Sequence, residues 1–175
     1  NVENVTLSNL RFTFPGNGTD PSESAKGGRD GSVPDASWYA VPENEDRYPE
    51  FAMFGTLPAY GFFVRHVRNL RMDNVEVAFR EPDNRPAVIC DDVQRLDIDG
   101  FYGMGTPEQE MLMGFRNVQD AIIRGCAPGP GVSTFLRLDG PETENIVLDA
   151  NAFLEGTVPV VRGSLAEPSG LPGLR

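Results

Sequence analysis

The chain has 175 residues and a mass of 19.1 kDa, the size of one domain or of part of one. Its 15 basic and 26 acidic residues give a net charge of −11, which disfavours nucleic acid and anionic membranes as partners. The 19 glycines and 15 prolines exclude a helical bundle and favour a turn-rich, all-β protein. No apolar run approaches the roughly 18 residues of a membrane-spanning helix.

The chain contains a repeat, which is the strongest signal for its fold. Five segments of eight residues share one pattern: 2–9 (VENVTLSN), 67–74 (VRNLRMDN), 93–100 (VQRLDIDG), 118–125 (VQDAIIRG) and 143–150 (TENIVLDA). The fourth position falls at Val5, Leu70, Leu96, Ala121 and Ile146, so successive copies begin 65, 26, 25 and 25 residues apart.

Each column of the repeat has a physical meaning. The fourth and sixth positions are apolar, and residues two apart share one face of a strand. The eighth position is Asn9, Asn74, Gly100, Gly125 or Ala150, and both asparagine and glycine tolerate a left-handed backbone. The eighth position therefore predicts a turn at which the chain leaves each strand.

A second strand precedes each of the later copies. Segments 61–64, 87–90 and 112–115 keep one offset from the repeat, and 134–138 is a looser fourth version. Short strands separated by turns, in units of 25 residues, predict a parallel β-solenoid whose coils stack at about 4.8 Å. We therefore expect Leu70, Leu96, Ala121 and Ile146 to lie one above another.

The domain organisation follows from the repeat. Coils are expected over residues 1–153, with a long loop excursion at about 15–58, and a Pro/Gly-rich tail over 154–175. The aromatic residues of the excursion, from Trp38 to Phe54, form either a platform for sugars or an anchor for the loop. The chain begins inside a coil without a capping helix, so we expect upstream coils of a longer protein, or a capping partner.

A family resemblance rests on the coil pattern Asn-Val-x-Leu-x-Asn and on two longer segments, 51–63 (FAMFGTLPAYGFF) and 83–89 (DNRPAVI). Together they resemble the C-terminal part of glycoside hydrolase family 28, which contains polygalacturonases and rhamnogalacturonan hydrolases. The resemblance implies a right-handed parallel β-helix of the pectin-lyase-like kind, here of about five coils. It also implies a secreted or periplasmic location and no cofactor.

The catalytic motifs of that family do not transfer to this chain. His66 is not part of Gly-His-Gly, and Lys26 is not part of Arg-x-Lys. Asn44-Glu45-Asp46 matches Asn-x-Asp inside the excursion, and Asp91-Asp92 follows Cys90 where the family has glycine. No catalytic residue is therefore assigned, and the resemblance implies that the acid and the base lie upstream of this chain.

In the family, the catalytic groups occupy the turn before the second strand, and stacked coils align them in one groove. By that resemblance we expect Tyr60, Asp83 and Arg85 to bind substrate in the groove wall. Tyr60 has a ring that can stack on a sugar, and Arg85 can form a two-pronged bond with a uronate carboxylate.

Other polar groups have plainer interpretations. Asp91-Asp92 is expected to be a solvated turn rather than an acid–base pair, and His66 a surface or hydrogen-bonding residue. Cys90 and Cys126 fall in apolar columns, so we expect both to be buried. The acidic residues Asp139, Glu142, Glu144, Asp149 and Glu155 lack the spacing of a calcium loop, so we expect a solvated face there and no metal site.

These expectations lead to one function and two alternatives. The first is the C-terminal β-helix portion of an enzyme that cleaves pectic or other uronate-containing polysaccharide by inverting hydrolysis. The second is a non-catalytic β-solenoid module that binds carbohydrate or mediates interactions. The third is a polysaccharide lyase, which needs calcium and a basic residue beside the sugar.

Overall fold

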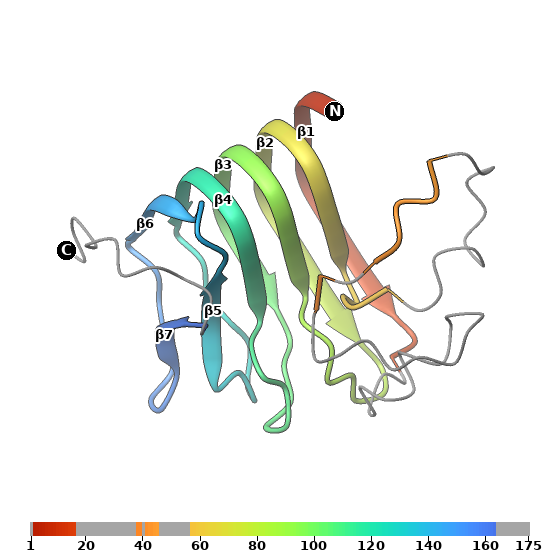
Figure 1. Cartoon of the computed structure of the whole chain (residues 1–175). Coiled ribbons are helices and arrows are strands. Elements are labelled where there is room, and N and C mark those ends of the chain that lie inside the picture. Colours follow the sequence, from red (N-terminus) through yellow and green to blue (C-terminus); the bar gives the residue numbers. More distant parts are fainter. Residues whose placement is uncertain (1, 17–37, 40, 46–56, 164–175) are drawn as a thin grey trace.

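The computed structural model describes residues 2–16, 38–39, 41–45 and 57–163. This part of the chain consists of strands and irregular segments (Figure 1). The strands are β1 (Val2–Phe14), β2 (Phe62–Phe79), β3 (Val88–Gly103), β4 (Met113–Arg124), β5 (Thr134–Asp139), β6 (Glu144–Asp149) and β7 (Val158–Arg162). Among these residues, no helix is long and apolar enough to cross a membrane.

All strand pairs are parallel and belong to one sheet, in the order β1-β2-β3-β4-β5-β7, with β6 also paired to β4. The sheet winds into a β-solenoid, so the predicted all-β parallel β-helix is confirmed. It has about four turns rather than the predicted five. The difference arises because the first copy of the repeat contributes β1 alone, without a preceding strand among the described residues.

The predicted stacking of the repeats is confirmed residue by residue. Leu70 pairs with Leu96, Leu96 with Ala121 and Ala121 with Ile146. The second strands also stack as expected, with Val64, Cys90, Phe115 and Leu138 in one column. Strands β5 and β6 pair with the two halves of β4, so together they form one coil interrupted at residues 140–143.

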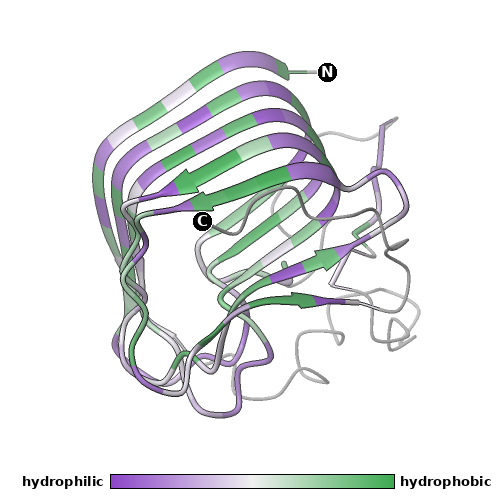
Figure 2. Cartoon of the chain, turned by 90° about the vertical axis from the view of Figure 1, so that its left-hand side faces the viewer, coloured by the Kyte–Doolittle hydropathy of each residue, from purple (hydrophilic) through white to green (hydrophobic). Residues whose placement is uncertain are grey.

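The interior of the coils is a continuous apolar column. Its largest fully buried side chains include Phe101, Phe115, Phe135, Met72 and Ile98. Figure 2 shows hydrophobic and hydrophilic residues alternating along the stacked strands, at corresponding positions in successive coils. Because alternate residues of a strand point to opposite faces, one set fills the interior and the other faces outward. The two cysteines belong to the buried set, as predicted.

Three columns of left-handed residues bend each coil. The predicted turn at the eighth repeat position is confirmed, with φ of 51–68° in all five copies. The second and third columns were not predicted: His66, Asp92, Asn117 and Gly140 form one, and Asn4, Asn69, Arg95, Asp120 and Asn145 the other. Asparagine side chains link neighbouring coils at these turns. Asn69 donates to Asn4 over 2.7 Å, and Asn74 donates to Asn9 over 2.8 Å.

The coils extend further towards the C-terminus than the sequence predicts. Strand β7 begins at Val158, beyond the expected boundary at 153, and pairs with β5 through Thr134↔Val158 and Leu136↔Val160. The apolar residues of β7 continue the parallel pairing of strands, although glycines lie nearby in the sequence. Residues 164–175 of the expected tail, and residues 17–37 and 46–56 of the excursion, lie outside the described residues.

Neighbouring isoleucines in β4 provide a test of this architecture. Ile123 is completely buried, whereas Ile122 points outward and is 42% exposed. We expect Ile123→Ala to lower the free energy of unfolding by about 2–5 kcal/mol, since it leaves a cavity in the column. Ile122→Ala is the matched control and should lower it by less than about 1 kcal/mol. Urea unfolding measures both values, and equal losses would contradict the assigned inner and outer faces.

Candidate functional site

One corner of the coils carries a column of alternating charge, here called the charge ladder: Arg65, Asp91, Arg116 and Asp139. The guanidinium of Arg116 donates to both oxygens of Asp91, over 2.7 and 2.5 Å. Asp91 is 4% exposed, so the prediction of a solvated turn is wrong for this residue. A buried carboxylate requires a bonded cation, which Arg116 on the next coil supplies.

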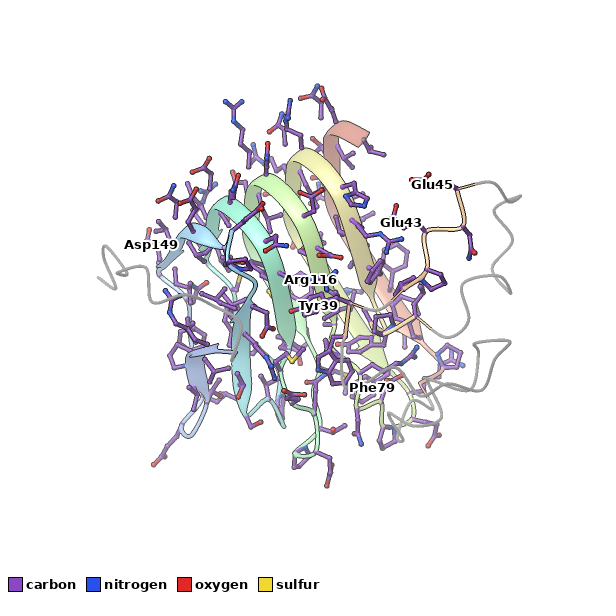
Figure 3. All side chains as sticks on the ribbon, in the orientation of Figure 1. Tyr39, Glu43, Glu45, Phe79, Arg116 and Asp149 are labelled. Carbon is purple, nitrogen blue, oxygen red and sulfur yellow. The ribbon has the colours of Figure 1, made fainter. Side chains whose placement is uncertain are left out.

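The described part of the excursion is anchored on this ladder. The Tyr39 hydroxyl donates to Asp139 over 2.9 Å, and the Arg116 guanidinium lies 4.7 Å from the centre of its ring. Figure 3 shows Tyr39 and Arg116 side by side. Burial raises the pKa of the Tyr39 phenol above its ordinary value. A Cβ on Gly114 would lie 3.1 Å from this hydroxyl and closer still to two apolar side chains, so the glycine leaves room for all three.

The two interpretations of the aromatic run can therefore be compared for two residues. Tyr39 is buried, and the Trp38 indole donates to Glu110 over 2.9 Å. Both contacts fit an anchor for the excursion. The remaining aromatic residues of the run, from Tyr48 to Phe54, lie outside the described residues.

His66 joins the same corner to the excursion. Its Nδ1 lies 2.5 Å from Asp92 Oδ2 on the next coil, and its Nε2 lies 2.9 Å from Glu43 Oε1. Hydrogen bonds with Glu43 and then Asp92 raise the pKa of His66, and the bond to His66 lowers the pKa of Glu43. The prediction of a hydrogen-bonding surface histidine is confirmed.

Beside His66 the surface is hollowed. A shallow depression of about 330 Å³, here called the Arg95 depression, is lined by Arg68, Gln94, Arg95, Gln119 and Asp120. A smaller hollow of about 30 Å³ is lined by His66, Val67, Arg68, Asp92 and Gln94. Because the two share Arg68 and Gln94, they form one polar surface across three coils.

Three of the residues that line the Arg95 depression, Arg68, Gln94 and Gln119, stack on successive coils and are here called the binding row. Arg68 pairs in register with Gln94, and Gln94 with Gln119. Arg68 Nε donates to Gln94 Oε1 over 3.3 Å, which leaves the amide N–H groups of Gln94 as donors. The column ends in a carboxylate on either side, at Glu3 and Glu144.

Arg95 is the exception in its column. It has a left-handed backbone with φ of 59°, where the other coils have asparagine or aspartate. This conformation costs about 1 kcal/mol for a long side chain. Arg95 also interrupts the side-chain hydrogen bonds that link the turns of this column from coil to coil. These bonds resume where Asn145 donates to Asp120 over 3.0 Å. Strain of this kind is concentrated at functional sites, and the side chain of Arg95 is exposed and makes no hydrogen bond or ion pair with the described residues.

The chemistry of this surface suits an anion that carries hydroxyl groups. Two guanidinium groups and one carboxylate line the depression, so its local charge is positive although the chain is strongly acidic. Arginine binds carboxylates through two parallel N–H donors, and glutamine amides bind hydroxyls. Sequence analysis missed this site, although Arg95 already stands out among Asn4, Asn69, Asp120 and Asn145 in the aligned repeats.

Tyr60, expected to stack on a sugar, is a core residue in this structure. It is 4% exposed, its ring packs edge-on against Phe79 with 5.3 Å between ring centres, and its hydroxyl donates to the Met104 carbonyl over 2.7 Å. Neither ring face is presented to a ligand. Burial raises the pKa of its phenol.

Asp83 and Arg85, the other expected binding residues, are brought together in an ion pair. Asp83 is fully buried and accepts from Arg85 Nε over 2.9 Å and from its terminal nitrogen over 2.6 Å. The backbone N–H of Arg85 donates to the same carboxylate over 3.0 Å. The pair therefore braces its own turn, and the arginine is left 17% exposed.

Other reactive groups are structural among the described residues. No group of three or more metal-ligating side chains occurs there. Burial raises the pKa of Cys126 to about 11, and also raises that of Cys90, so neither thiol ionises readily. Asp139, expected on a solvated face, is buried and bonded to Arg137 over 3.0 Å.

The strained turn at Arg95 yields a prediction about stability. We expect Arg95→Asn to raise the free energy of unfolding by about 1 kcal/mol, because asparagine tolerates the left-handed backbone and restores the linked turns. Arg68→Asn is the control: it removes an arginine of the same depression from an unstrained position, and it should bring no gain. Urea unfolding measures both, and an Arg95→Asn protein no more stable than the original would contradict the assigned strain.

Comparison of the chain with models of known protein families, with curated proteins and with solved structures finds no match. The resemblance to glycoside hydrolase family 28 therefore stays a prediction.

Proposed function

We propose that this β-helix binds a uronate-containing polysaccharide at the Arg95 depression and forms part of the groove wall of a glycoside hydrolase-like protein. The observation that carries the proposal is the pair of exposed arginines, Arg68 and Arg95, beside two stacked glutamines. The reaction would be inverting hydrolysis, with its catalytic carboxylates supplied from outside this chain. Such a substrate implies a secreted or periplasmic protein.

The local charge favours this ligand despite the net charge of −11. Arg116 and Arg137 are bound to buried carboxylates of the charge ladder, and Arg124 is bound to Asp99. Arg95 has no such partner among the described residues, and Arg68 lies 3.6 Å from Glu3 with a side chain 54% exposed. A uronate can approach these two guanidinium groups without displacing a buried bond.

The binding row also fits a chain-like ligand. Its three side chains lie on successive coils, about 4.8 Å apart, and so present donors in a line. Glu3 and Glu144 at the ends of the column would repel further carboxylates. The row therefore favours a short acidic stretch of polysaccharide lying across β2, β3 and β4.

A non-catalytic carbohydrate-binding module is the second candidate. The carboxylates beside the Arg95 depression are already engaged, since Asp92 is bonded to His66 and Asp120 to Asn145. Neither is a free acid or base for glycoside hydrolysis, which needs two opposed carboxyl groups. This candidate shares the ligand of the first and differs in the absence of turnover.

Binding of an oligogalacturonate of defined length tests both candidates. We expect Arg95→Ala and Arg68→Ala each to weaken binding about tenfold, the effect of losing one charge-assisted contact. Arg71→Ala is the matched control, because Arg71 is exposed on β2 outside the depression and should leave affinity unchanged. Isothermal titration calorimetry measures the affinities.

The carboxyl-reduced, neutral form of the same oligosaccharide should bind weakly to every variant. Equal affinity for the acidic and neutral forms, or equal losses in all three variants, would contradict the proposal. Release of reducing ends from polygalacturonate by a longer protein that contains this chain together with the catalytic carboxylates then separates a hydrolase from a binding module.

A further inference from the structure

The described part of the excursion touches the coils at a second place, above the anchor of Tyr39. Arg65 donates to the carbonyls of Val41 and Pro42, over 2.5 and 3.4 Å. His66 contacts the Glu43 carboxylate of the same segment. Figure 3 shows Glu43 on this segment, which passes beside the coils, and Glu45 further along it. Segment 41–45 is thus held by two neighbouring residues of β2.

His66 is bonded on both sides at once. Its Nε2 contacts Glu43 in the excursion, and its Nδ1 contacts Asp92 in the following coil. A neutral imidazole has one N–H donor, whereas the imidazolium has two. Since both partners are carboxylates that accept hydrogen bonds, both contacts are complete only when the ring is protonated. The geometry therefore selects the imidazolium.

The charged groups around the ring strengthen this selection. Glu43 and Asp92 face it from the excursion and from β3, and Arg65 lies 3.8 Å from the Glu43 carboxylate. Arg68 borders the small hollow that His66 and Asp92 also line. Asp91, the residue before Asp92, forms an ion pair with Arg116. Two carboxylates thus contact the imidazolium, and the raised pKa of His66 agrees with their influence.

We propose that His66 is a pH-sensitive clasp, which fastens segment 41–45 to the coils when protonated and releases Glu43 when it loses its proton. As pH rises, the proton passes to solvent, and one ring nitrogen then turns a lone pair toward a carboxylate. Asp92 is held in the backbone of β3, next to the paired residues Asp91 and Val93. Glu43 belongs to no strand, so it is the partner that leaves.

The clasp also bears on the Arg95 depression, and this part rests on the proposed function. Asp92 lines the hollow that shares Arg68 and Gln94 with the depression. Loss of the imidazolium charge leaves Asp92 uncompensated beside these groups. An anionic ligand should therefore bind more weakly once His66 is neutral, because the potential over the depression becomes more negative.

The titration of His66 by NMR tests the clasp directly. The imidazole should titrate with a pKa above the ordinary value of about 6.5, and the amide signals of residues 41–45 should change with the same midpoint. Glu43→Gln and Asp92→Asn should each lower that midpoint. Glu45→Gln, which removes the same charge two residues away, is the matched control and should leave the midpoint unchanged.

The stability of the protein should follow the same titration. Because the folded-state pKa of His66 lies above its unfolded value, the clasp's contribution is complete below about pH 6.5 and is lost as pH rises through the raised pKa. A His66 that titrates at or below its ordinary value would overturn the proposal. Equal effects of Glu43→Gln and Glu45→Gln would overturn it as well.

Oligogalacturonate binding measured across the same pH range tests the coupling. Affinity should fall through the His66 midpoint in the original protein and stay level in His66→Asn, since asparagine tolerates the left-handed turn at this position. Binding that is independent of pH in the original protein would overturn the coupling. No binding at any pH would overturn the proposed function, whereas the NMR titration decides the clasp in either case.

Discussion

The parallel, in-register stacking of coils is the constraint on which this molecule depends. Each residue lies directly above its counterpart one coil away. The side chains of every column must therefore be able to pack against one another or bond to one another. Apolar columns satisfy this condition by filling the interior, as Leu70, Leu96, Ala121 and Ile146 do. Polar columns satisfy it by amide links between asparagines or by alternating charge. The charge ladder is the clearest case, since arginine and aspartate alternate along four coils, and both of its carboxylates are buried.

The same rule makes the exceptions informative. Arg95 breaks a column of asparagine and aspartate, occupies a strained backbone and lines the Arg95 depression. His66 stands above Asp92 in a column that continues with Asn117 and Gly140, and it reaches out of the stack to Glu43. We propose that Arg95 serves ligand binding, and His66 the attachment of segment 41–45, rather than the stability of their own columns. The candidate ligand site and the proposed clasp lie next to each other, since the small hollow lined by His66 shares Arg68 and Gln94 with the Arg95 depression.

The fold was predictable from the sequence to the level of individual columns, because the 25-residue period and the apolar positions determine which residues stack. The expected binding residues were less predictable. Tyr60 follows the residue pattern of a turn, yet its ring packs inward against Phe79. Asp83 and Arg85 are two residues apart, and their sequence does not reveal that they satisfy each other. The contacts of His66 depend on Glu43, which is far away in the chain and has no place in the repeat.

The spacing of the coils along the chain also affects how they assemble. Most neighbouring coils join residues about 25 positions apart, whereas β1 meets β2 across a separation of 65. Closing the longer loop in the unfolded chain costs about 0.8 kcal/mol more in entropy. Pairing of β3 with β4 across the shorter loop is therefore favoured before pairing of β1 with β2.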